Sequence, residues 1–338
     1  MQIWPMRPLL WDDQEQPIRD SESWHKRAAT IRQTFVKTLG EAPDSQRLHS
    51  YETVERVESE GVARTLLRIT VDNDDVMEAF LMEPADAAKR KPGAVALALH
   101  QTNNEGKNEV AGIAGLATLR YALELAQRGW TVLAPDQFAI TRRYGKEVGA
   151  FDTARFYDRF PKWSAVGKSV RDSQIALDVM EQLPQTKGHR PSVIGHSLGG
   201  HGSVFLAAVD DRISQVVSNC GVYPFADSFA REQWFREHWY IYFKDPAFKK
   251  SVVQGPVPLW DFHELCALVA PRRLCLLSAS NDVLVRSAWG LHQMGEQLHR
   301  LYALLQTNGA LLTVTHNEEH SFSNANRAMA YAWLEAGI

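Results

Sequence analysis

The pattern of apolar and polar residues begins with one amphipathic helix. Apolar residues recur at steps of three and four between Trp24 and Leu39, and Gly40 ends the run. Farther on, VARTLLRITV and VMEAFLME are β-rich runs separated by the turn cluster DNDD. The pattern therefore predicts an N-terminal helical extension over residues 1–49, followed by a small antiparallel sheet over residues 50–83.

From residue 93 onward, short apolar runs alternate with helical patterns. The predicted strands are GAVALALH, WTVLAPD, PSVIGHS, ISQVVSNC, RRLCLLSAS and LLTVTH. The predicted helices cover 114–129, 164–183, 198–209, 287–306 and the C-terminal ANRAMAYAWLEAG. Continuous apolar runs are typical of strands buried on both faces of a sheet, and alternation with helices makes that sheet parallel. We therefore expect one doubly wound α/β domain over residues 1–338, mostly parallel, with an antiparallel N-terminal part.

Residues 221–265 interrupt this alternation and are rich in aromatic residues. This segment is predicted to be a helical cap inserted into the domain. Its rings have two possible roles, which are to pack the insertion onto the sheet or to line a substrate pocket. Trp234, Trp239 and Tyr240 are the pocket candidates within it.

The run PSVIGHSLGG carries the first sign of chemistry. Ser197 follows an apolar strand, precedes a helical pattern, and has Gly195 and Gly199 two positions away on either side. This G-x-S-x-G pattern is typical of a nucleophile elbow, in which a sharp turn exposes the serine above the end of the sheet. The glycines allow the strand and helix to approach closely.

A serine hydroxyl is a weak nucleophile until a base accepts its proton. The sequence offers an acid and a base in the order Ser, Asp, His, and each follows its own predicted strand. Asp282 follows RRLCLLSAS, and His320 follows LLTVTH. We predict that His320 acts as general base and then general acid, and that Asp282 orients its imidazole and stabilises the charged form.

Other titratable residues fit these roles less well. His316 is the alternative base, but it lies near its strand end and is expected to be structural. His196 should point away from the nucleophile and serve in packing or hydrogen bonding. Asp261 and Glu264 precede the strand that leads to Asp282. Asp136 is interpreted as a loop cap.

An oxyanion hole requires two backbone N–H donors. Leu198, directly after the nucleophile, should supply one, and Gln101, after the strand GAVALALH, the other. Thr102 is the alternative second donor and a further pocket candidate. His100 is a pocket candidate that could instead shape this loop.

Together, GHSLGG, LHQT, RGWTVLAPD, SASND and NEEHSF resemble the α/β-hydrolases over about residues 90–338. More narrowly, the chain is similar to bacterial serine hydrolases grouped with dienelactone hydrolases and acetylxylan esterases. The resemblance implies hydrolysis of small-molecule carboxylic esters through an acyl-enzyme, with no metal or organic cofactor. It assigns the nucleophile, acid and base to Ser197, Asp282 and His320. The chain differs from true dienelactone hydrolases, which have a cysteine nucleophile, and its HQT replaces the common HG-type oxyanion pattern.

Charge and composition limit the partners. The formal net charge of −3 gives no electrostatic reason to expect nucleic acid or a membrane as a partner. The three cysteines show no CxxC spacing, so we expect neither a disulfide framework nor a zinc site. The N-terminus does not resemble a signal peptide, which predicts a cytoplasmic location. The alternatives are a small-peptide or amide hydrolase on the same triad, and a non-catalytic binding protein.

Overall fold

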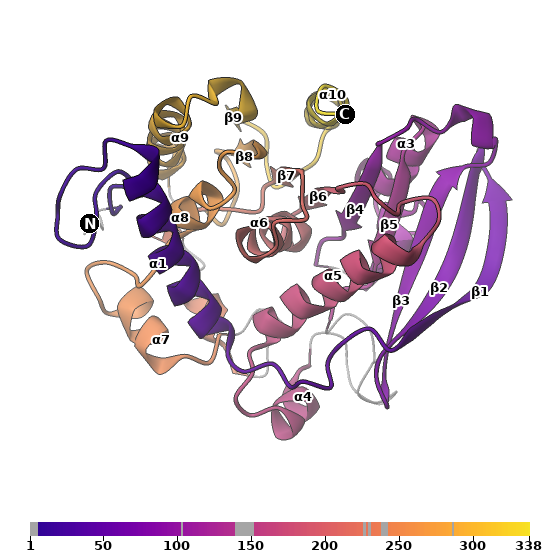
Figure 1. Ribbon diagram of the computed structural model, residues 1–338, viewed down its shortest axis with the longest axis horizontal. Helices are drawn as coiled ribbons and strands as arrows, with labels where there is room; N and C mark the ends of the chain where they lie inside the picture. Colours follow the sequence, from indigo (N-terminus) through magenta and orange to yellow (C-terminus); the bar gives the residue numbers. More distant parts are fainter. Residues whose placement is uncertain are drawn as a thin grey trace.

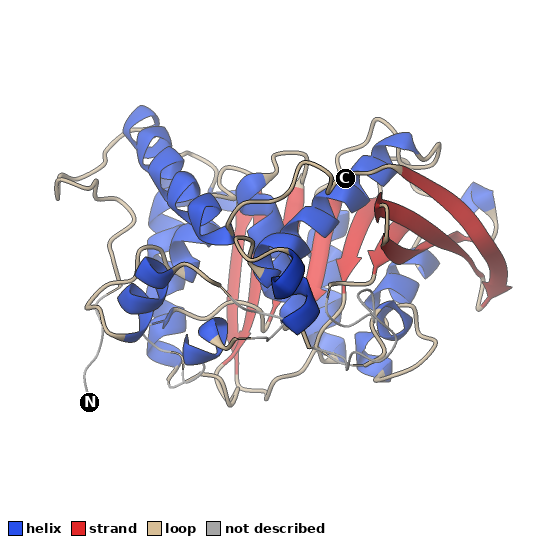
Figure 2. Ribbon diagram, turned by 90° about the horizontal axis from the view of Figure 1, so that it is seen from below, coloured by secondary structure: helices blue, strands red, loops and turns tan. Residues whose placement is uncertain are grey.

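The computed structural model describes residues 6–102, 104–138, 152–225, 228, 231–237, 243–285 and 287–338. One nine-stranded sheet runs through the molecule between two layers of helices (Figures 1 and 2). The strand order is β1-β2-β3-β5-β4-β6-β7-β8-β9. Helices between successive parallel strands account for this order, because a parallel connection must cross a face of the sheet.

The antiparallel part of the sheet is the predicted N-terminal portion. It comprises β1 (Ser50–Ser59), β2 (Val62–Asp72) and β3 (Asp75–Pro84), and β3 pairs antiparallel with β5 (Thr131–Pro135). These long strands extend to one end of the molecule (Figure 2). The remaining strands pair in parallel: β4 (Val95–Leu99), β6 (Ser192–His196), β7 (Gln215–Asn219), β8 (Arg273–Ala279) and β9 (Leu311–His316).

The two faces of the sheet bury alternate residues of the same strands, as strand geometry requires. On one face, Leu97 and Val193 pack with a first set of helices, and on the other, Ala98 and Ile194 pack with a second set. The first set is α1 (Ser21–Leu39), α5 (Ala165–Gln182), α6 (Leu198–Val209), α8 (Phe262–Ala267) and α9 (Ala288–Leu304). The second is α2 (Lys107–Val110), α3 (Tyr121–Gln127) and α10 (Asn324–Glu335).

The helix predicted over 114–129 is wrong at its N-terminal end. The structure has a short 3-10 turn at Ala117–Leu119, and α3 begins only at Tyr121. The preceding loop is fixed by Gly115, whose φ is +77°, and by Glu109, whose Oε1 accepts a 3.1 Å hydrogen bond from the Leu116 N–H. A left-handed glycine stops a helix from extending backward through it.

The interruption at 221–265 contains short helices joined by irregular chain where it is described. It contains a 3-10 helix, η4 (Arg231–Phe235), then α7 (Pro246–Val253) and α8. Its rings pack chiefly on one another and on α6, as in the stacked Phe248–Trp260 pair with centroids 4.5 Å apart. Its treatment as a separate cap stays a prediction. In the described segments, no helix combines the length and apolarity needed to cross a membrane.

Candidate active site

Ser197 occupies a strained turn between β6 and α6. Its backbone has φ 54° and ψ −117°, a conformation that non-glycine residues rarely adopt. The Ser197 N–H donates a 2.9 Å hydrogen bond to the Asn219 carbonyl on the neighbouring strand β7. The turn therefore raises Ser197 at the carboxyl edge of the sheet, as the sequence pattern predicts.

The flanking glycines are required by space. A Cβ atom built on Gly195 would lie 2.1 Å from the Gly199 carbonyl oxygen, and one built on Gly199 would lie 1.8 Å from the Leu99 carbonyl oxygen. Gly200 and Gly221 approach each other in the same way, with a Gly200 Cβ 2.8 Å from the Gly221 Cα. Any side chain at these positions would push α6 away from the strands that hold the turn.

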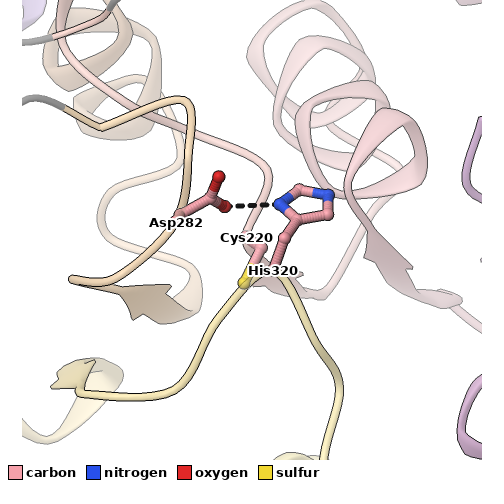
Figure 3. Close-up of side chains that lie close together, drawn as sticks. All are labelled: Cys220, Asp282 and His320. Carbon is pink, nitrogen blue, oxygen red and sulfur yellow. Dashed lines mark hydrogen bonds and ion pairs between the residues drawn. The ribbon is translucent and has the colours of Figure 1, made fainter.

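Asp282 and His320 lie in the loops after β8 and β9 and are hydrogen-bonded to each other. His320 Nδ1 pairs with Asp282 Oδ2, and the second ring nitrogen of His320 points away from the carboxylate (Figure 3). The Asp282 side chain is buried, whereas that of His320 is 27% exposed. This pairing fixes the imidazole orientation and leaves Nε2 available to a neighbouring group.

The Asp282 carboxylate accepts hydrogen bonds on both oxygens. The Tyr223 hydroxyl donates to Oδ2 over 2.5 Å, and the Leu284 N–H donates to Oδ1 over 2.9 Å. Burial acts to raise the pKa of Asp282, but the hydrogen bonds from His320 and Tyr223 outweigh it, so the pKa lies below its ordinary value. The carboxylate is therefore charged near neutral pH.

Two residues connect the serine turn to the histidine loop. Asn219 Nδ2 donates to the Ser321 carbonyl over 2.8 Å and pairs with His196 Nδ1 at 2.7 Å. The His196 ring lies 4.8 Å from the His320 ring, measured between centroids. Burial, together with the nearby His320, lowers the pKa of His196 to about 3. His196 is thus a neutral residue that serves in packing and hydrogen bonding, as predicted. It directly precedes Ser197, and its ring packs beside the His320 ring.

A pocket of about 90 Å³ includes Ser197 in its wall. Thr102 and Trp234, both predicted pocket residues, line it, and so do Tyr223 and His201. Its remaining described walls are mostly apolar or uncharged, with Cys220, Gly221, Ser228, Gln233, Phe262 and Leu284. Trp239 and Tyr240 lie outside the described residues.

Comparisons with known proteins bear on the fold that carries this site. No family model matches the chain. It is 28% identical over 283 residues to the Bacillus subtilis (strain 168) protein named "Putative hydrolase YtaP", covering 81% of this chain and 88% of that one. In structure it is similar to a glucuronoyl esterase from Solibacter usitatus, with a TM-score of 0.75 and 19% identity over 99% of this chain and 98% of that chain. A "putative acetyl xylan esterase" from Bacteroides fragilis NCTC 9343 gives a TM-score of 0.69 and 16% identity, covering 94% of this chain and 89% of that one.

The chain has the α/β-hydrolase fold. The fold that the resemblance implied is confirmed, and the structural neighbours are named as esterases. In this fold the carboxyl edge of the parallel strands is where ligands bind. Ser197, Asp282 and His320 each follow a strand at that edge.

The candidate oxyanion donors lie in the segments that follow β6 and β4. Leu198 is the first residue of α6, so its N–H has no acceptor within the helix. Gln101 follows β4, and its side chain donates to Glu109 Oε1 over 3.2 Å, which anchors the loop. His100 is fully buried and its ring nitrogens bond to the Gln101 carbonyl and the Gln137 N–H, both at 2.8 Å. These contacts match the loop-shaping interpretation of His100 and leave it out of the pocket wall.

The acids set aside in the sequence have structural partners. Asp136 Oδ1 accepts a 2.8 Å hydrogen bond from the Lys107 N–H, which makes it a loop cap as predicted. Asp261 and Glu264 form a capping box at the start of α8.

His316, the alternative base, lies at the end of β9, with Nδ1 3.9 Å from Glu318. Burial lowers the pKa of His316, and Glu318 and Asp282 oppose that effect.

Among the described residues, one group of side chains has the ligand types and spacing that could hold a metal ion: Cys220, Asp282 and His320. The Cys220 sulfur lies within 4.8 Å of ligand atoms on Asp282 and His320 (Figure 3). A metal would need the thiolate and would compete for the His320 nitrogen that already bonds Asp282. Burial, reinforced by the charge of Asp282, raises the pKa of the Cys220 thiol to about 12. Cys220 is therefore better described as a neutral, buried thiol that packs against its neighbours than as a metal ligand.

Proposed function

We propose that the protein is a serine hydrolase that cleaves small or medium carboxylic esters through an acyl-enzyme. The observation that carries this proposal is the Asp282–His320 hydrogen bond, formed at the same sheet edge where Ser197 occupies its strained turn. A nucleophile, a base oriented by a buried acid, and backbone donors at a helix N-terminus form the set that acyl transfer requires.

In the first half-reaction His320 Nε2 accepts the Ser197 hydroxyl proton while Oγ bonds to the ester carbonyl carbon. The carbonyl oxygen becomes an oxyanion, and the Leu198 and Gln101 N–H groups are the proposed donors to it. Asp282 stabilises the imidazolium through Nδ1. The carbon–oxygen bond to the alcohol then breaks, and the alcohol leaves with the proton from His320.

In the second half-reaction water replaces the alcohol. His320 accepts a proton from the water as its oxygen attacks the acyl carbon, and the tetrahedral intermediate forms again at the same oxyanion donors. Its collapse releases the carboxylic acid and returns the proton to Ser197 Oγ. The chain's own residues thus supply every proton transfer in the cycle.

The pocket supports an ester of modest size with a polar part. Trp234 and Phe262 provide apolar surface beside Ser197, and Thr102, Gln233 and Ser228 provide hydrogen-bonding groups. Acetylated sugars are compatible with such a wall, and the esterases similar in structure are named for glucuronoyl and acetyl xylan esters.

The test is a panel of p-nitrophenyl esters of increasing acyl length, together with acetylated sugars, assayed with wild type and Ser197→Ala. We expect wild type to cleave short esters and Ser197→Ala to lose at least about 10³-fold in kcat. Matched aminoacyl amides separate an esterase from a peptide or amide hydrolase. If wild type cleaves neither esters nor amides, the binding-protein alternative replaces this proposal.

A further inference from the structure

Tyr223 lies where it can control the acid of the candidate triad. It follows β7, a strand that contributes none of the predicted catalytic residues, and its side chain lines the pocket that includes Ser197. Its hydroxyl donates to Asp282 Oδ2 over 2.5 Å, and His320 Nδ1 bonds to that same oxygen. Only 7% of Tyr223 is exposed, so water competes poorly for this hydrogen bond.

We infer that Tyr223 is a positioning residue whose hydroxyl shares one oxygen of Asp282 with His320 and thereby sets how strongly the acid stabilises the charged imidazole. This inference rests on the proposed function of the triad. A donor that withdraws negative charge from Oδ2 weakens the attraction between that oxygen and an imidazolium. Tyr223 therefore favours the neutral imidazole, which is the form able to accept the serine proton.

Tyr223 is held in the donor state by its surroundings. Burial raises the pKa of Tyr223 well above its usual value, and the neighbouring Cys220 and Asp282 raise it further. Its hydroxyl also has a hydrogen-bonding contact with the Cys220 side chain, whose sulfur lies 3.6 Å from the Ser321 carbonyl. The phenol thus stays protonated throughout the working pH range and can only donate to the carboxylate.

The other groups around Asp282 do not duplicate this contact. The Leu284 N–H bonds to the opposite oxygen, Oδ1. His196, His316 and Cys220 act on the site through charge or packing, and burial lowers the pKa of both histidines and raises that of the thiol. Among the described residues, Tyr223 and His320 are the side chains with a hydrogen bond to Oδ2.

Removing the Tyr223 hydroxyl has a direction that can be stated in advance. The Oδ2 charge would then act on His320 alone, the charged imidazole would be favoured, and a higher pH would be needed to make it neutral. The acidic limb of the profile of kcat/KM against pH should move to higher pH by about half a unit to one unit. On that limb, activity should fall by roughly 3- to 10-fold, with a smaller change at the optimum.

The experiment compares Tyr223→Phe with Tyr331→Phe. Tyr331 is a matched control because its hydroxyl also donates to a carboxylate, Glu124 Oε2, over 2.7 Å, and it is also buried but belongs to α10. Profiles of kcat/KM against pH are measured with the best p-nitrophenyl ester. The His320 Nδ1 proton is followed by NMR in the same proteins without substrate.

We expect the acidic limb and the imidazole N–H resonance to shift in Tyr223→Phe and to stay at the wild-type position in Tyr331→Phe. Site-specific 3-fluorotyrosine at position 223 keeps the packing and makes a stronger donor, so it should move the limb to lower pH and serves if Tyr223→Phe does not fold. Unchanged limbs and resonances in the folded position-223 variants overturn the inference. A wild type that cleaves no ester instead overturns the proposed function, and the NMR shift still tests the Tyr223 contact.

Discussion

Gly199 lies so close to Leu99 that a Cβ atom at position 199 would be 1.8 Å from the Leu99 carbonyl oxygen. The atom it would meet belongs to the backbone of β4, which cannot rotate away as a side chain can. Helix α6, which begins directly after Ser197, can therefore pack this closely against β4 because residue 199 has no side chain. This contact holds the serine turn and the loop carrying Gln101 at a fixed separation.

Gly199→Ala should destabilise the protein and reduce its activity together. Relieving the overlap requires α6 or β4 to move, and such overpacking costs about 1–3 kcal/mol in the free energy of unfolding. Urea unfolding monitored by tryptophan fluorescence measures the loss.

Gly202→Ala is the control for Gly199→Ala, because it lies in the same helix and its added Cβ would meet neighbours at an ordinary 3.4 Å. It should be within about 1 kcal/mol of wild type, since alanine is favoured over glycine in a helix. Equal effects of the two substitutions would show that close packing at Gly199 is unimportant.

Asp282→Asn should lower kcat with little change in the folded structure. The amide matches the carboxylate in shape, but it cannot stabilise an imidazolium and it favours the wrong orientation of the ring. Loss of a triad acid costs about 10³- to 10⁴-fold in kcat. Stopped-time assays across pH 6–9 with the substrate chosen from the ester panel measure it, with Asp261→Asn as the control in the α8 cap. A fall confined to Asp261→Asn would transfer the acid role away from Asp282.

The stability contributed by Asp282 should depend on pH with a definite sign. Its pKa is below the ordinary value in the folded protein, so the ionised carboxylate stabilises the fold above the unfolded-state pKa of about 3.9. That contribution disappears as the pH falls through the folded-state pKa. The difference in unfolding free energy between wild type and Asp282→Asn should therefore be constant near neutrality and change below about pH 4. A difference that is the same at every pH would mean that Asp282 titrates alike in both states.

Lys168 should be essential for stability, although it lies outside the candidate site. Its ammonium group is fully buried and bonds to Asp75 Oδ2 at 2.7 Å, Asp172 Oδ1 at 2.6 Å and Gln46 Oε1 at 2.7 Å. Lys168→Met removes the cation facing two buried carboxylates, which should cost about 3–5 kcal/mol. Lys26→Met breaks an exposed pair with Glu22 of the same 2.7 Å length and should leave the free energy of unfolding almost unchanged, because solvent screens that pair. Chemical denaturation compares them, and similar losses would contradict the role of burial.

The sequence predicted the sheet and the order of the candidate triad because both depend on strand ends. Parallel strands bring their carboxyl ends to one edge, so Ser197, Asp282 and His320 could be placed there without knowing any distance. Helix limits were harder to predict. Leu116 continues an apolar pattern, yet the left-handed glycine before it and its hydrogen bond to Glu109 keep it outside the helix.

Tyr223 and Asn219 were missed by sequence reasoning. Asn219 ends β7 and Tyr223 lies in the loop after it, and this strand has no acid or base of its own to attract attention. The contacts of Tyr223 with Asp282 and of Asn219 with Ser321 join segments 59 and 102 residues apart in the chain, which periodicity cannot detect. Their position at the carboxyl edge was the available signal, because every loop at that edge can face the site.

The central claim is that Ser197 carries the acyl group, and its most direct test is peptide mapping after reaction with a fluorophosphonate probe. Native wild type, heat-unfolded wild type and Ser197→Ala are labelled, digested and examined by mass spectrometry. The account predicts a phosphonyl adduct on Ser197 in native wild type alone, because only the folded protein has His320 in place to remove the serine proton. Native protein that remains unlabelled, or an adduct on another residue that persists in Ser197→Ala, would contradict it.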